Sequence, residues 1–85
     1  MPQFNLELRT ENRVWETMSV EMADVTALRI ELARFVGQLL KDHAKEIWVD
    51  EEWRVDATDE DGLILFMIQI LATNSPATLS FRDRR

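Results

Sequence analysis

The stretch WRVDATDEDGLILFMIQI, residues 53–70, decides the fold of this chain because it predicts two β-strands joined by a tight turn. Its first arm alternates between an apolar set, Trp53, Val55 and Ala57, and a polar set, Arg54, Asp56 and Thr58. Its second arm, extended to Leu71, places Ile64, Phe66, Ile68 and Ile70 on one face and Leu65, Met67, Gln69 and Leu71 on the other. A period of two residues is typical of strands that bury one face.

The acidic turn DEDG between these arms has two interpretations. A calcium-binding EF-hand loop with Gly62 at its sixth position would have Asp59 and Asp61 at positions three and five. Positions one and twelve are then Ala57 and Ile68, which cannot coordinate the ion. Asp-Gly between two alternating runs is instead a strong hairpin signal, because both residues tolerate positive φ. We therefore expect a hairpin and no metal site.

Upstream of this hairpin the apolar period changes to that of a helix. Asp24 is a suitable N-cap, and a helix is predicted over residues 25–45. Its apolar stripe consists of Val25, Leu28, Leu32, Phe35, Val36 and Leu39. Gly37 lies within this helix, where it suggests close packing against a sheet. Residues 47–49 form an apolar patch that is predicted only as a connection.

The N-terminal part of the chain predicts a second hairpin. Residues 4–9 alternate between Phe4, Leu6 and Leu8 on one face and Asn5, Glu7 and Arg9 on the other. In the following strand, Val14, Met18 and Val20 are expected on one side and Trp15, Thr17 and Ser19 on the other. The fold class is therefore α+β, with the order ββαββ and a four-stranded, mainly antiparallel sheet packed on one helix. Residues 1–72 form this single domain, and residues 73–85 are expected to be a flexible, basic-ended tail in which Leu79 and Phe81 could dock.

The charge of the chain argues against nucleic-acid binding. It has 16 acidic and 10 basic side chains, for a net charge of −6, and the final RDRR contributes +2, which leaves −8 on the rest. Such a surface repels phosphate backbones. The longest apolar run, residues 63–68, is far too short to span a membrane, and the N-terminus lacks a signal pattern. With no cysteine, a soluble cytoplasmic protein is expected.

No residue pattern predicts catalysis. His43 is the single histidine and is interpreted as an ordinary residue near the helix C-terminus. The acids between Asp50 and Asp61, Asp56 among them, lie in a turn or at outward strand positions and are expected to remain solvated. We therefore predict no enzyme activity, no catalytic or metal-binding residue, no cofactor and no evident small-molecule ligand. The alternative is a small ligand-binding protein or enzyme that uses the acidic loop with Trp48 or Trp53, which a pocket lined by His43 and one of those acids would favour.

The predicted architecture leaves one face of the sheet uncovered, because one helix covers only one face. The candidate interface comprises Leu65, Met67 and Leu71 on that open face, together with Trp15. A second copy of the chain or another protein partner is the expected occupant. The alternative is that the tail, or the patch at residues 47–49, folds back over these side chains. The function expected is thus a non-enzymatic interaction or regulatory module.

Three motifs in order, MPQFNLEL, SVEMADVTALRIEL and WRVDATDEDGLILFMIQI, resemble a family of small uncharacterised bacterial proteins classed as a domain of unknown function. Its members share a strand hairpin, a helix and a hairpin with an Asp-Glu-Asp-Gly turn, and the likeness covers residues 1–70. Ser19 and Asn5 depart from the glycine and the aromatic residue expected there. The family implies no activity, cofactor or site residue. A looser likeness, of layout and acidity, is to antitoxin domains that neutralise a basic protein.

Overall fold

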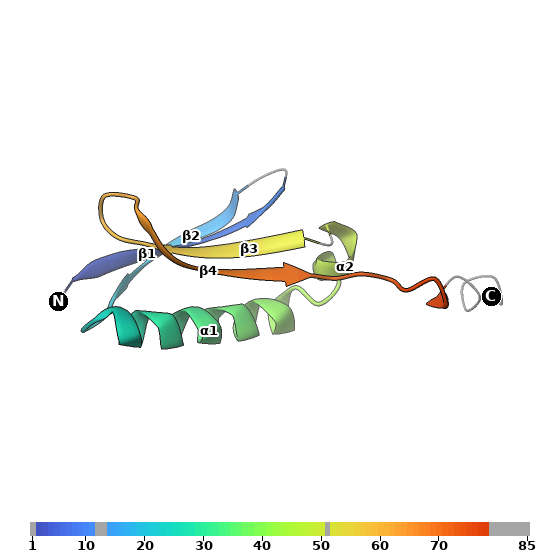
Figure 1. Ribbon diagram of the computed structural model, residues 1–85, viewed down its shortest axis with the longest axis horizontal. Coiled ribbons are helices and arrows are strands. Elements are labelled where there is room, and N and C mark those ends of the chain that lie inside the picture. The colour runs from blue at the N-terminus through green and yellow to red at the C-terminus, as the bar shows by residue number, and fades with distance from the viewer. Residues whose placement is uncertain (1, 12–13, 51, 79–85) are drawn as a thin grey trace.

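The computed structural model describes residues 2–11, 14–50 and 52–78. Its elements are β1 (Gln3–Thr10), β2 (Val14–Glu21), α1 (Val25–Asp42), α2 (Glu46–Asp50), β3 (Glu52–Thr58) and β4 (Ile64–Leu71). The predicted α+β fold and its ββαββ order are confirmed, with α2 as a short additional helix. One sheet lies over α1, and residues 73–78 extend beyond the sheet at the end where α2 lies (Figure 1).

The sheet has the strand order β2-β1-β3-β4, and every neighbouring pair is antiparallel. Strands β1 and β3 join the two hairpins at the centre, where Leu6 lies opposite Ala57 and Leu8 opposite Val55. Strands β2 and β4 are therefore the two edges. Because β2 is followed by α1 and then by β3, the chain crosses over β1 before it re-enters the sheet.

The hydrophobic core lies between α1 and one face of the two central strands. All of the predicted inward residues of β1 and β3 are buried: Phe4, Leu6, Leu8, Trp53, Val55 and Ala57. Leu28, Leu32, Val36 and Leu39 meet them from α1. The face assignment made from the alternating sequence is thus confirmed for both central strands.

Helix α1 begins where the sequence predicts and ends three residues earlier. The Asp24 carboxylate accepts a hydrogen bond of 2.8 Å from the Ala27 amide, which confirms the N-cap. At the other end, the His43 amide donates to the Leu39 carbonyl at 2.9 Å and closes the helix. Gly37 is exposed, and no heavy atom lies within 4 Å of the place where a Cβ would stand. The expectation that Gly37 packs closely against the sheet is therefore wrong.

Helix α2 replaces the connection expected around residues 47–49. Ile47 is buried and joins the core, whereas Trp48 and Val49 are exposed. After β4, Ala72 is buried, and residues 73–78 lead away from the sheet past α2 (Figure 1). The rest of the predicted tail, with Leu79 and Phe81, lies outside the described residues.

Edge strand β2 contains one extra residue, which corrects its predicted faces. Arg9 lies opposite Val14, and Leu8 lies opposite Glu16, so Trp15 is the extra residue of β2. One inserted residue reverses the alternation beyond it. Trp15 therefore turns to the core side, where its ring lies 5.0 Å from that of Trp53, and it does not lie on the open face. Val14 takes the open-face position instead.

Edge strand β4 has the corresponding irregularity near its start. Ala57 lies opposite Phe66, and Thr58 lies opposite Ile64, which leaves Leu65 as the extra residue. Leu65 packs against the core, so its predicted place on the open face is wrong. Ile64, predicted to face the helix, is instead 46% exposed.

Candidate functional site

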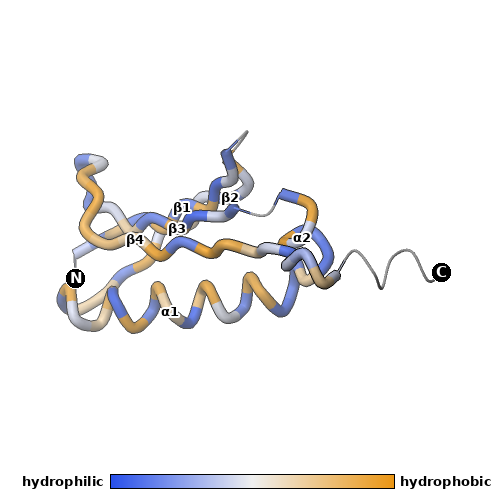
Figure 2. The backbone as a smooth tube through the Cα atoms, turned by 45° about the vertical axis from the view of Figure 1, so that its right-hand side comes forward, coloured by the Kyte–Doolittle hydropathy of each residue, from blue (hydrophilic) through white to orange (hydrophobic). Residues whose placement is uncertain are grey.

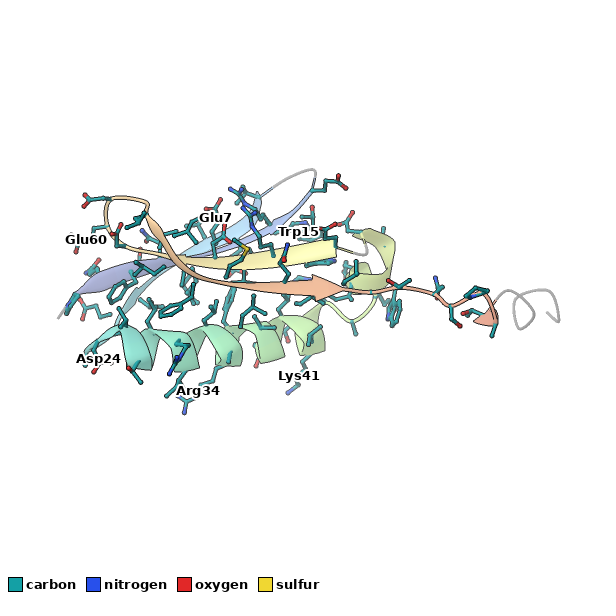
Figure 3. All side chains as sticks on the ribbon, in the orientation of Figure 1. Glu7, Trp15, Asp24, Arg34, Lys41 and Glu60 are labelled. Carbon is teal, nitrogen blue, oxygen red and sulfur yellow. The ribbon has the colours of Figure 1, made fainter. Side chains whose placement is uncertain are left out.

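The centre of the open face is charged. Glu7 lies opposite Asp56, and Arg9 lies opposite Arg54. We call these four residues the charge square. Its ion pairs run along the strands: Arg9 Nη2 lies 2.8 Å from Glu7 Oε1, and Arg54 Nε lies 3.0 Å from Asp56 Oδ1. Glu7 projects from the side of the sheet opposite α1 (Figure 3).

The two acids of the charge square differ in burial. The Asp56 side chain is 3% exposed, whereas that of Glu7 is 27% exposed. Arg54 contacts both oxygens of Asp56, the second through Nη2 at 3.1 Å, and Met67 stands opposite Asp56 on β4. The expectation that Asp56 stays solvated is wrong, because long neighbouring side chains cover it. A carboxylate buried in this way depends on its paired cation.

The charged form of Arg9, the other arginine of the charge square, is stabilised by Glu7 and Asp56. The hydrogen bond from Arg9 to Glu7, and then the attraction of the Glu7 charge, raise the pKa of the Arg9 guanidinium above its ordinary value. Asp56 adds a smaller effect in the same direction. Arg9 on β1 is thus influenced by an acid on its own strand and by one on β3.

A cavity of about 260 Å³ opens at one end of the charge square, which we call the arginine cavity. Its walls come from the end of β1, the start of β3 and the facing part of β4. The lining residues are Arg9, Thr10, Glu11, Glu52, Trp53, Arg54 and Gln69. The side chains of Thr10 and Trp53 belong to the core face of the sheet, whereas Arg9 and Arg54 belong to the open face. Sequence patterns could not reveal this cavity, because it depends on the pairing of β1 with β3.

A separate groove of about 250 Å³ lies between β2 and α1. Its lining includes the apolar Leu8, Met18, Phe35 and Leu39, with Glu16, Gln38, Asp42 and His43. The imidazole of His43 also lies 5.7 Å from the Trp15 ring. The acids in this groove, Glu16 and Asp42, come from β2 and α1. The enzyme alternative needs His43 beside an acid from residues 50–61, and this groove has none of those acids in its lining.

The acidic loop itself forms the predicted hairpin turn. One oxygen of Asp59 accepts hydrogen bonds from the Asp61 and Leu63 amides, both at 2.9 Å. Gly62 has a φ of 87°, the left-handed conformation that glycine adopts readily. Glu60 projects outward from the turn (Figure 3). The hairpin is confirmed, and among residues 2–11, 14–50 and 52–78 no group of three or more candidate ligands could hold a metal ion.

The candidate interface is only partly brought together. Met67 and Leu71 lie on the open face, opposite Asp56 and Glu52, whereas Trp15 and Leu65 turn toward the core. Two residues that the alternation missed join them at the start of the strand. We call these four exposed apolar residues the β4 strip. Their exposed fractions are Leu63 63%, Ile64 46%, Met67 45% and Leu71 73%. Figure 2 shows β4 as a mostly hydrophobic strand at the edge of the sheet.

One signal in the sequence could have identified β4 as the unusual edge. It has eight residues, ILFMIQIL, and none is charged. The other edge, β2, has the sequence VWETMSVE and carries two glutamates. Among the helices that the structure describes, none has the length and apolar character needed to span a membrane.

Comparison with known proteins gives one result. A family model described as a domain of unknown function (DUF6894) matches residues 3–72, from the first residue of β1 to the residue that follows β4. Neither a curated protein nor a solved structure matches the chain significantly. The resemblance to a domain of unknown function is confirmed for this range.

Proposed function

Because this chain belongs to the DUF6894 family, whose description names no activity, we propose a function from its surface: a non-enzymatic interaction module that acts as a homodimer joined along β4. The observation that carries this proposal is the β4 strip. It places four exposed apolar side chains in, or directly before, a strand whose outer edge has no partner strand among the residues that the structure describes. Such an edge favours pairing with another strand.

A second copy is the occupant that fits the charge of the molecule. The chain carries −6, so two copies repel each other wherever acids meet. Strand β4 contains no charged residue, and antiparallel pairing with itself about a two-fold axis brings no like charges opposite each other along it. Backbone hydrogen bonds would then extend the sheet across the axis.

Helix α1 enlarges the apolar surface beside β4. Gln38 lines the groove on the β2 side. Leu40 lies about 200° further around the helix, which places it on the flank next to β4. It is 43% exposed. A stable interface buries about 800 Å² per partner, so we expect the contact to include this flank as well as the β4 strip.

Sedimentation velocity over micromolar concentrations tests the proposal. The unaltered protein is expected to sediment as a dimer, and Met67→Lys as a folded monomer, because the new charge would be buried at the contact. Thr17→Lys is the matched control, since Thr17 is exposed at the other edge of the same face. Retained association in Met67→Lys, or a monomeric unaltered protein, would contradict the β4 dimer.

The net charge of −6 supports a second candidate, an acidic neutraliser of a basic protein. Salt separates the two, because it screens charge pairing while leaving apolar contact intact. A dimer joined by the β4 strip should persist in 1 M salt, where the Debye length is about 3 Å. Binding of a basic probe such as polylysine that is lost at that salt concentration would instead favour the acidic neutraliser. The bacterial origin and cytoplasmic location expected from the sequence remain predictions.

A further inference from the structure

The groove between β2 and α1 combines apolar and acidic side chains in its lining. Its deepest apolar residues are Leu8 and Leu39, which are buried, and the more accessible Met18 and Phe35 complete the apolar part. An apolar cavity of about 150 Å³ can hold benzene. The groove has a volume of about 250 Å³, so it has room for an aromatic ring with a short chain attached.

Two carboxylates reach this groove from its two opposite walls. Glu16 lies across the ladder from Leu8, so its side chain is on the face of β2 that is turned toward α1. Asp42 comes from α1, and its Oδ1 accepts a hydrogen bond of 2.9 Å from Gln38 Nε2. Among the residues that the structure describes, neither carboxylate has a salt-bridge partner. The lining also contains no lysine or arginine, so both negative charges are uncompensated there.

Neither acid stands where the stability of the fold would place it. Glu16 interrupts the apolar face of β2 that Met18 and Val20 continue. An inward-pointing charge on an edge strand can prevent unwanted pairing, but this does not account for the acid on the opposite wall. Asp42 is the last residue of α1, where the negative end of the helix dipole disfavours a carboxylate. Residues that oppose their local structure in this way are expected at functional sites.

We propose that the groove between β2 and α1 binds a small organic cation with an apolar body, of the arylalkylammonium class. The ring packs on Phe35 and Leu39, and the ammonium group donates to Glu16 and to the second oxygen of Asp42. An inorganic cation would leave the apolar lining in water, and an anionic ligand would meet two like charges. The negative charge of the whole chain also attracts a cation. The groove lies at the edge opposite to β4, so this inference does not depend on the proposed dimer.

An NMR titration of the intact chain tests this assignment with three probes that share one phenyl ring. Phenethylammonium carries the positive charge, phenethyl alcohol is neutral and hydrocinnamate is an anion. In ¹⁵N–¹H spectra, phenethylammonium is expected to shift the Gln38 carboxamide and the Leu39 amide with a common saturation curve. The alcohol should bind at least about tenfold more weakly, because it loses the charge-assisted contacts, and hydrocinnamate more weakly still. Equal binding of the alcohol and phenethylammonium, or no saturable shift with phenethylammonium at millimolar concentration, would overturn the proposal.

Glu16→Gln combined with Asp42→Asn is the decisive variant, because it removes both charges and keeps an oxygen that can accept from Gln38. We expect it to weaken phenethylammonium binding at least about tenfold. The matched control is Glu60→Gln combined with Asp61→Asn at the exposed hairpin turn, from which Glu60 projects outward (Figure 3). Asp42→Asn alone should raise the melting temperature of the free protein, so weaker binding would not reflect unfolding. Unchanged binding in the decisive variant, or an equal loss in the control, would refute the proposal.

Discussion

The two edge strands of this sheet have the same length but differ in the polarity of their exposed side chains. Both β2 and β4 have eight residues, and each contains one extra residue that turns an apolar side chain to the core. Strand β2 exposes Glu16, Thr17, Ser19 and Glu21, which protect an edge from pairing. Strand β4 has Gln69 as its single polar residue. The molecule thus has one protected edge and one that is available for contact.

This asymmetry limits how far the proposed association can proceed. A chain with two adhesive edges would add copies at both sides and form open fibres, whereas one adhesive edge ends assembly at a two-fold dimer. The acids on β2 therefore matter as much as the apolar residues on β4.

The largest effect is expected at the two acids of the charge square, Asp56 on β3 next to β4 and Glu7 on β1 next to β2. Asp56→Ala removes a buried carboxylate behind β4 and leaves Arg54, 31% exposed, without its partner. We expect a loss of about 2 to 3 kcal/mol in the free energy of unfolding, because part of the Arg54 charge stays hydrated. Glu7→Ala, on β1 next to β2, should cost less than about 1 kcal/mol, since the Arg9 and Glu7 side chains are 38% and 27% exposed. Urea unfolding of both variants measures the difference, and equal losses would show that burial does not distinguish them.

The second-largest effect is expected at the two glutamates that keep β2 from pairing with another strand. In Glu16→Thr combined with Glu21→Thr, the charges of this edge are removed while its β-forming character is kept. New strand pairing should then gain about 1 to 2 kcal/mol from several cross-strand contacts. Light scattering is expected to show species larger than a dimer that grow with concentration. If the double variant remains a dimer, the glutamates are not what protects this edge.

A smaller effect is expected at the turn that presents β4. Asp59→Ala removes the oxygen that accepts the Asp61 and Leu63 amides. The variant should lose about 1 to 1.5 kcal/mol of stability, because both amides are exposed and water replaces part of each bond. Thermal unfolding measures this loss, and Glu60→Ala at the exposed tip serves as control. A loss of the same size in the control would contradict the role of Asp59.

The smallest effect is expected in α1, away from both edges. Gly37→Ala adds a methyl group where no heavy atom lies within 4 Å. It should stabilise the fold by about 0.5 to 1 kcal/mol through helix propensity and a less flexible unfolded chain. Association should not change, so this variant separates stability from dimer formation. A destabilised Gly37→Ala would show that the helix packs more tightly there than the structure indicates.

The sequence predicts the central part of this fold better than its edges. The uninterrupted alternation of β1 and β3, and the Asp24 N-cap, are local patterns, and the structure confirms them. Alternation predicts the wrong face for Trp15 and Leu65, because each strand contains an extra residue whose place the sequence does not mark. The burial of Asp56 and the arginine cavity depend on which strands are neighbours, so residues far apart in the chain determine them.

The pairing of β1 with β3 also has a consequence for how the chain reaches its native state. Each hairpin forms from nearby residues, but an isolated two-stranded hairpin is marginal in water. Joining them requires closure of the long segment that contains α1, which is the slow type of step in folding. Substitutions at Leu6 or Ala57, which meet across this pair, should therefore slow folding, whereas those at the turn should mainly affect the local hairpin. The same geometry makes the two hairpins natural halves for fragment complementation, with reassembly reporting on the central pair and on the core that α1 forms against it.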